Sequence, residues 1–154
     1  MTHPFVALGA ISVTVITATF GILQVPGWVE RAENDTASSV LAHVQAYENA
    51  AVTKTRAYWG GDVLQEKADM QHDRFSADGT VIVCATASPA GDGYALIARS
   101  KNGTFLARTS SSTDEGKGET AEAALAEAGG LPPGVPSPTS GSTCAPGAAL
   151  ALTS

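Results

Sequence analysis

The feature that most constrains this chain is an uncharged stretch near its start, residues 5–25 (FVALGAISVTVITATFGILQV). As an α-helix the stretch would be roughly 31 Å long, which matches a hydrocarbon core of about 30 Å. A helix satisfies its own backbone hydrogen bonds in lipid, so the stretch predicts one transmembrane stem helix. With residues 1–4 as a short head, we expect a single-pass membrane protein whose C-terminal part is extracytoplasmic.

Two alternatives remain open for this stretch. A cleaved signal peptide would have a basic start, an apolar core of about 7 to 15 residues and a small-residue cleavage site. Residues 1–4 contain no Lys or Arg, although residues 17–19 resemble a weak cleavage region. A buried helix of a soluble core would need apolar cover on every side, and the rest of the chain is too polar to supply it. The membrane span is therefore the preferred interpretation.

Residues 26–56 are expected to continue the helix with one apolar face. The positions that recur on successive helical turns are apolar except for one: Ala37, Val40, Leu41, Val44, Tyr47, Glu48 and Ala51. A new start at the cap-like Asn34 would instead divide the helix in two. Continuity is preferred because residues 29–33 contain no strong turn signal. This apolar face predicts packing against a core.

Residues 57–154 are expected to form a small β-rich domain. Three β-rich runs, residues 80–87, 94–100 and 104–110, predict an antiparallel three-stranded meander, with Asn102-Gly103 as the hairpin turn between the last two. The apolar face of the long helix is available to cover this sheet. The predicted fold class is therefore α+β, a long N-terminal helix packed on a small antiparallel sheet.

The C-terminal third contains few regular patterns. Residues 111–118 are predicted to be an acidic loop, and residues 119–128 a short helix that ends at Gly129 and Gly130. Residues 131–143 are rich in Pro, Gly, Ser and Thr and predict a loop. The chain has only two cysteines, Cys84 and Cys144, and a disulfide between them is the simplest expectation for an exported domain; two unpaired thiols are the alternative.

The sequence contains few clusters of residues that could act in catalysis or bind a metal, and no catalytic motif is present. We therefore do not expect an enzyme. His72 with Asp69 and Asp73 is a weak metal candidate, and His43 is expected on a helix surface. Oxygen ligands for Ca²⁺ are offered by Asp114, Glu115 and Glu119 beside glycines, although a solvated acidic loop is the simpler interpretation and no cofactor is expected. The sequons at Asn34 and Asn102 are candidate glycosylation sites. A net charge of −6 disfavours nucleic acid as a partner.

The order of these parts resembles the type IV pilin and type II secretion pseudopilin superfamily. In that family the mature chain begins with Phe and a proline follows 21 residues later, as Phe5 and Pro26 do here. The run ADGTVIVCATASPAGDGYALIARSKNGTFLARTSSS also looks like the strands of pilin-like globular domains. Two positions depart from the family pattern: Pro4 stands where the family has Gly before the cleavage site, and Gly9 where it has a stem glutamate.

The resemblance implies a structural, pilin-like subunit, expected to be a minor one, of a type IV pilus or secretion pseudopilus. Its partners would be membrane lipid and other pilin-like subunits, contacted through small stem residues on one side of the helix: Ala10, Thr14, Thr17 and Gly21. The alternative is a single-pass, membrane-anchored extracytoplasmic binding domain that does not polymerise. An extracytoplasmic hydrolase is a third, weaker hypothesis.

Overall fold

The computed structural model describes residues 4–67, 81–140 and 143–150, and within these it describes side chains from residue 27 onward, except those of residues 67, 143 and 149. The chain divides into two compact units, Met1–Ala32 and Glu33–Ser154. Within the described part of the chain, no helix is long and apolar enough to cross a membrane. The predicted span, residues 5–25, lies outside the residues whose side chains are described, so it stays a prediction.

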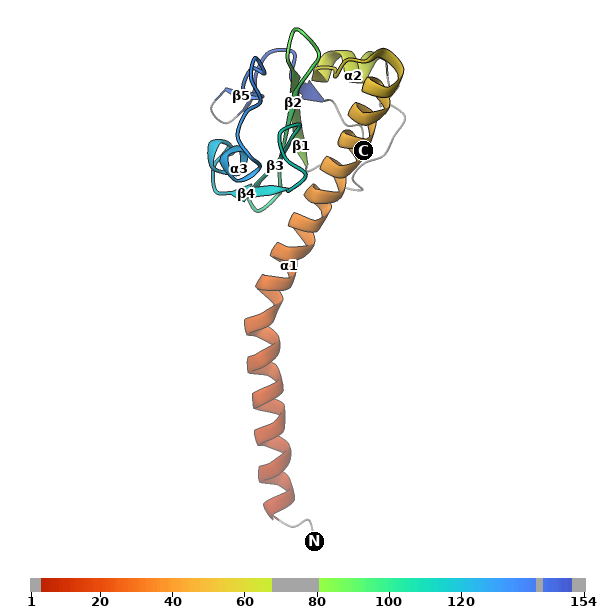
Figure 1. Cartoon of the computed structure of the whole chain (residues 1–154). Helices are drawn as coiled ribbons and strands as arrows, with labels where there is room; N and C mark the ends of the chain where they lie inside the picture. The colour runs from red at the N-terminus through yellow and green to blue at the C-terminus, as the bar shows by residue number, and fades with distance from the viewer. Residues whose placement is uncertain (1–3, 68–80, 141–142, 151–154) are drawn as a thin grey trace. The chain divides into compact units, whose positions relative to one another are not determined.

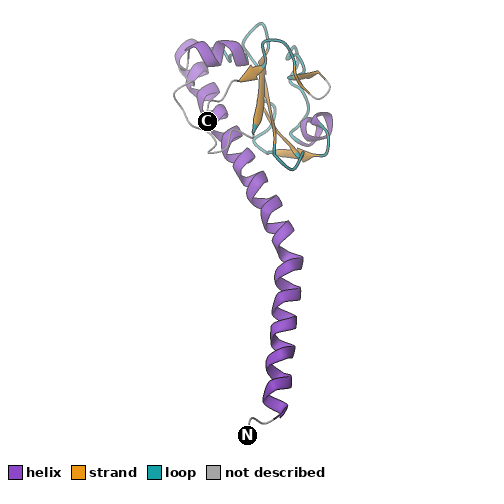
Figure 2. Ribbon diagram, turned by 180° about the vertical axis from the view of Figure 1, so that it is seen from behind, coloured by secondary structure: helices purple, strands orange, loops and turns teal. Residues whose placement is uncertain are grey.

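The first element is the helix α1, Pro4–Thr55, which runs without interruption past Pro26 and Asn34 (Figures 1 and 2). The alternative of a separate helix that starts at Asn34 is therefore wrong. Beyond the helix, Arg56 adopts a left-handed backbone conformation with φ of 61°, and a short helix α2, Gly61–Lys67, follows. This turn directs the chain from α1 towards the sheet.

The predicted meander is confirmed, as β1 Ile82–Ala87, β2 Tyr94–Arg99 and β3 Phe105–Thr109. Each strand pairs antiparallel with the next; Val83 lies opposite Ala98, and Ala98 lies opposite Leu106. Gly103 has a positive φ of 89° in the turn between β2 and β3, where the sequence predicted a hairpin. The strands thus follow from the runs of β-branched and apolar residues and from this turn.

The sheet is larger than predicted, with five strands in the order β4-β3-β2-β1-β7. The prediction of a plain loop at residues 111–118 is wrong at its end, because β4, Gly116–Gly118, pairs with β3. At the other edge, β7, Ala149–Leu150, pairs with β1. Within the predicted loop of residues 131–143, β5, Thr139–Ser140, forms a separate two-stranded sheet with β6, Thr143–Cys144.

Each face of the five-stranded sheet carries its own apolar cluster. On one face Val83, Leu96 and Leu106 pack with the predicted stripe of α1, whose Ala37, Val40, Leu41 and Val44 are buried. The opposite face packs against α3, Ala121–Glu127, through residues that include Ile97, Ala107, Ala124 and Leu125. Successive strand residues point to opposite faces, so the sheet separates two helical layers.

The edge strand β4 depends on glycine. A Cβ atom on Gly116 would overlap the carbonyl oxygen of Ala124 and lie 2.5 Å from the backbone nitrogen of Ala128, so only glycine lets β4 approach α3 this closely. The backbone N–H of Lys117 donates to the Glu127 carboxylate at 2.7 Å. Helix α3 thus both packs on this strand and satisfies one of its donors.

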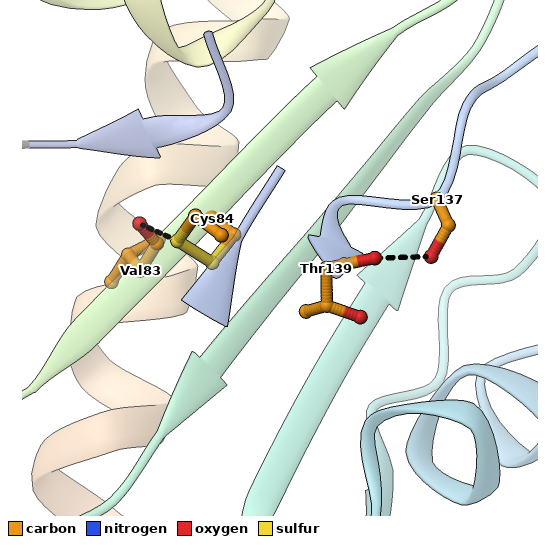
Figure 3. The surroundings of a disulfide bond; sticks show 5 residues. Val83, Cys84, Ser137 and Thr139 are labelled. Carbon is orange, nitrogen blue, oxygen red and sulfur yellow. Dashed lines mark hydrogen bonds between the residues drawn. A yellow bond between two sulfur atoms is a disulfide. The ribbon is translucent and has the colours of Figure 1, made fainter. Parts of the chain in front are cut away.

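The predicted disulfide between Cys84 and Cys144 is present, with its Cα atoms 5.5 Å apart (Figure 3). It joins β1 to β6 across a sequence separation of 60 residues. The sulfur atom of Cys144 lies 3.6 Å from the carbonyl oxygen of Val83. Nearby, the Ser137 hydroxyl donates to the Thr139 carbonyl oxygen at 3.4 Å. The bond fixes the Pro-rich and Gly-rich C-terminal segment to the central sheet.

Candidate functional site

A groove of about 510 Å³ lies within the unit Glu33–Ser154 and is lined almost entirely by polar side chains. We call it the polar groove. Its lining consists of Gln45 and Asn49 from α1, Tyr58 from the turn after α1, Tyr94 at the start of β2, and residues 109–113 at the end of β3 and in the loop that follows. None of these side chains carries a formal charge at neutral pH.

A hydrogen-bond network fixes the orientation of Gln45. Its amide nitrogen donates to the hydroxyl oxygen of Tyr94 at 2.8 Å, and its amide oxygen accepts from the guanidinium of Arg108 at 2.7 Å. Arg108 also forms a 2.9 Å ion pair with Glu115, whose carboxylate accepts from the Ser38 hydroxyl at 2.8 Å as well. The network links α1 to β3, and it leaves the second N–H of Gln45 available to a ligand.

Two tyrosines form the aromatic part of the polar groove. The rings of Tyr58 and Tyr94 meet edge to face, with their centroids 4.8 Å apart. The backbone N–H of Tyr58 donates to the carbonyl oxygen of Gly91 at 2.9 Å, which holds the turn after α1 against the β1–β2 connection. Burial raises the pKa of Tyr94 above its ordinary value, while the hydrogen bond from Gln45 opposes that rise. Tyr94 therefore keeps its proton at neutral pH.

The loop after β3 contributes hydroxyl groups at the rim. The Ser110 hydroxyl oxygen accepts from the backbone N–H of Tyr94 at 3.1 Å, which joins the loop to β2. The Ser112 hydroxyl accepts from the backbone N–H of Asp114 at 3.0 Å. Ser111 and Thr113 are exposed at the rim. The polar groove thus combines amide and hydroxyl groups that can both donate and accept hydrogen bonds.

Glu48 lies in the apolar layer between α1 and the sheet, and it is fully buried. One carboxylate oxygen, Oε2, accepts from the backbone N–H of Trp59 at 3.0 Å, whereas Oε1 has no hydrogen-bond partner within the described structure. Burial raises the pKa of Glu48 to about 7, and the bond from Trp59 lowers it in part. The sequence predicted the burial of this position but not its altered pKa.

The structure does not assemble the candidate calcium ligands. Glu115 is bound to Arg108, and Asp114 and Glu119 are exposed. Among the described residues, no group of three His, Cys, Asp or Glu side chains could hold a metal ion. The candidates His72, Asp69 and Asp73 lie outside the described residues, and the side chains of the stem candidates Phe5, Ala10, Thr14, Thr17, Gly21 and Pro26 are not described. His43 is exposed on α1, as expected.

The two candidate glycosylation sites meet in the folded domain. Asn34 is buried, and its amide oxygen accepts a 3.2 Å hydrogen bond from the amide nitrogen of Asn102. The Nδ2 atom of Asn102 donates this bond and so holds α1 against the β2–β3 turn. It is the same atom to which an N-linked glycan would be attached. The folded structure gives both asparagines a packing role.

Sequence reasoning missed the polar groove because its lining comes from four separated segments. The available signal was local: Gln45 and Asn49 are polar, lie four positions apart and therefore share one side of α1. Nothing in the sequence indicated that Tyr58 and the loop after β3 would meet them. Comparison of this chain with protein-family models, with curated proteins and with solved structures finds no match.

Proposed function

We propose that this protein is a pilin-like structural subunit that assembles with other subunits through its hydrophobic stem helix. The observation that carries the proposal is α1, a single 52-residue helix that contains the uncharged residues 5–25 and also the stripe that packs on the antiparallel sheet. The first part of such a helix would span a membrane, and its second part packs on the sheet of the domain. This arrangement suits a subunit that is stored in a membrane before assembly.

Two further observations support the same proposal. Trp28 and Val29, which follow the uncharged stretch after Pro26 and Gly27, are 65% and 51% exposed, as is typical of residues that contact a lipid boundary or a neighbouring subunit. The disulfide fixes the C-terminal segment to the sheet, which suits a domain that must persist in an oxidising, extracytoplasmic setting.

Co-purification of two differently tagged copies from the same membranes tests the proposal. Replacing Ala10 and Gly21 by Leu adds apolar surface and should preserve membrane insertion, yet it should reduce co-purification because small residues let helices approach closely. The matched control replaces Ser12 and Thr19 by Leu, since these positions fall on the opposite side of a helix with 3.6 residues per turn. The control variant should co-purify like the wild type.

A polyleucine replacement of residues 5–25 sharpens the test. It retains an anchor and removes every specific packing position, so a pilin-like subunit should lose assembly. If polyleucine copies co-purify as well as wild-type copies, the stem is only an anchor. The second candidate function, a membrane-anchored extracytoplasmic binding domain that does not polymerise, then accounts for the chain, and the polar groove is the observation that favours it.

A further inference from the structure

We propose that the polar groove binds a neutral saccharide. The inference concerns a ligand of the globular unit, goes beyond the proposed structural role and does not depend on filament assembly. It rests on the charge, the hydrogen-bonding groups and the aromatic surface of the polar groove. Its volume of about 510 Å³ lies within the range of sites that hold small molecules, roughly 300–1,000 Å³.

The charge of the site indicates a neutral ligand. Arg108, the cation that contacts Gln45 of the lining, is paired with Glu115 at 2.9 Å and donates a further N–H to Gln45. An anionic ligand would therefore have to break an existing ion pair to find a cation, at a cost in affinity. An apolar ligand would leave the amide and hydroxyl groups of the lining without partners, which is also costly.

The amides on α1 provide hydrogen bonds of the kind that a sugar diol requires. Gln45 is held by Tyr94 and Arg108, so its free N–H is oriented before a ligand arrives and little side-chain entropy is lost on binding. Asn49, one helical turn further along, is exposed at the same rim. Each side-chain amide can donate to the oxygen of one sugar hydroxyl, and an amide oxygen can accept from the adjacent sugar hydroxyl.

Tyr58 supplies the apolar contact, because Tyr94 is buried. A pyranose ring has hydroxyl groups around its edge and a C–H surface on its face, so it needs an aromatic ring beside polar groups. Tyr58 lies in the lining, half-buried, and its edge-to-face contact with Tyr94 fixes its ring. Ser111 and Thr113 add exposed hydroxyl groups to the lining, and these can both donate and accept hydrogen bonds.

The test is titration of the full-length chain in a zwitterionic detergent, because sugar-headed detergents would compete for the site. The neutral probes are glucose, galactose, N-acetylglucosamine and the β-1,4-linked dimer of N-acetylglucosamine; the charged probes are glucose 6-phosphate and galacturonate. Binding is followed by ligand-detected NMR and calorimetry. We expect saturable binding of at least one neutral probe, and weaker binding of both charged probes.

Variants connect that binding to the polar groove. Asn49→Ala and Ser111→Ala each remove one exposed rim group and should weaken binding by about threefold to tenfold. Ser111→Trp should block it, whereas Ser39→Trp, on an exposed position of α1 outside the lining, should leave it unchanged. An unchanged circular dichroism melting curve confirms that each variant is folded.

Four results would overturn the proposal, and three of them concern the saccharide titration: no saturable binding of any neutral probe, equal or tighter binding of the charged probes, or binding that survives Ser111→Trp. Saturable binding of short neutral peptides in place of saccharides would likewise overturn it. None of these results bears on co-purification of tagged copies, so failure here is distinct from failure of the proposed structural role.

Discussion

Asn34 and Asn102, which lie 68 positions apart in the sequence, join their side-chain amides at 3.2 Å and tie α1 to the turn between β2 and β3. The amide oxygen of Asn102 also accepts from the backbone N–H of Thr104 at 3.0 Å and from the Ser100 hydroxyl. One exposed asparagine therefore shapes the hairpin turn and holds it against the helix.

This contact predicts a measurable coupling. Asn34→Ala should lower the free energy of unfolding by about 0.5–1.5 kcal/mol, because it removes a partly buried hydrogen bond. Asn102→Ala should cost more, since it also removes the turn contacts. In a double-mutant cycle, measured by denaturant unfolding, the two changes should be less than additive. Thr53→Ala, which removes an exposed side-chain bond on the same helix, is the control and should change stability by under about 0.5 kcal/mol.

The disulfide should contribute strongly to stability. Closing a loop of 60 residues restricts the unfolded chain by about 4 kcal/mol in the chain-entropy description. Replacing both Cys84 and Cys144 by Ala should therefore lower the free energy of unfolding by up to this amount, as measured by denaturant unfolding of the oxidised wild type and the double variant. Hydrogen exchange should increase first at β7, which pairs with β1 beside Cys84. A double variant as stable as the wild type would contradict this account.

Parts of the fold were predictable because they carry a local period. The stripe Val40, Leu41 and Val44 repeats at helical spacing, and β1 to β3 combine β-branched residues with turn residues. By contrast, β4 is Gly-Lys-Gly and β7 has two residues, so neither contains enough side chains to show a period. These strands form because tertiary partners, α3 and the edge of β1, are already in place. The polar groove escaped prediction for the same reason, since its segments meet only in the folded domain.

The dependence of β4 on glycine gives a third prediction. Gly116→Ala should destabilise the domain by about 1–3 kcal/mol, because the added methyl group would overlap backbone atoms of α3. Gly27→Ala is a matched control, since a Cβ atom there has no neighbour within 4 Å and the residue lies inside a helix. The control should leave unfolding of the sheet unchanged or raise helix stability by up to about 1 kcal/mol. Equal melting temperatures for the two variants would mean that α3 can move away from β4 at little cost.

The last prediction concerns the dependence of stability on pH through Glu48. Its pKa is about 7 in the folded protein and about 4.5 when unperturbed, so the folded state holds a proton that the unfolded chain releases between these values. The contribution of protonated Glu48 to the free energy of unfolding is therefore fully present below about pH 4.5 and is lost as the pH rises to about 7. The loss from this group should approach about 3 kcal/mol.

Glu48→Gln keeps an acceptor for the N–H of Trp59 and has no proton to lose. Denaturant unfolding at intervals from pH 5 to pH 8 should show the wild type losing stability relative to this variant, with the difference levelling off above about pH 7. Parallel curves for the two proteins would show that Glu48 does not retain its proton in the folded domain.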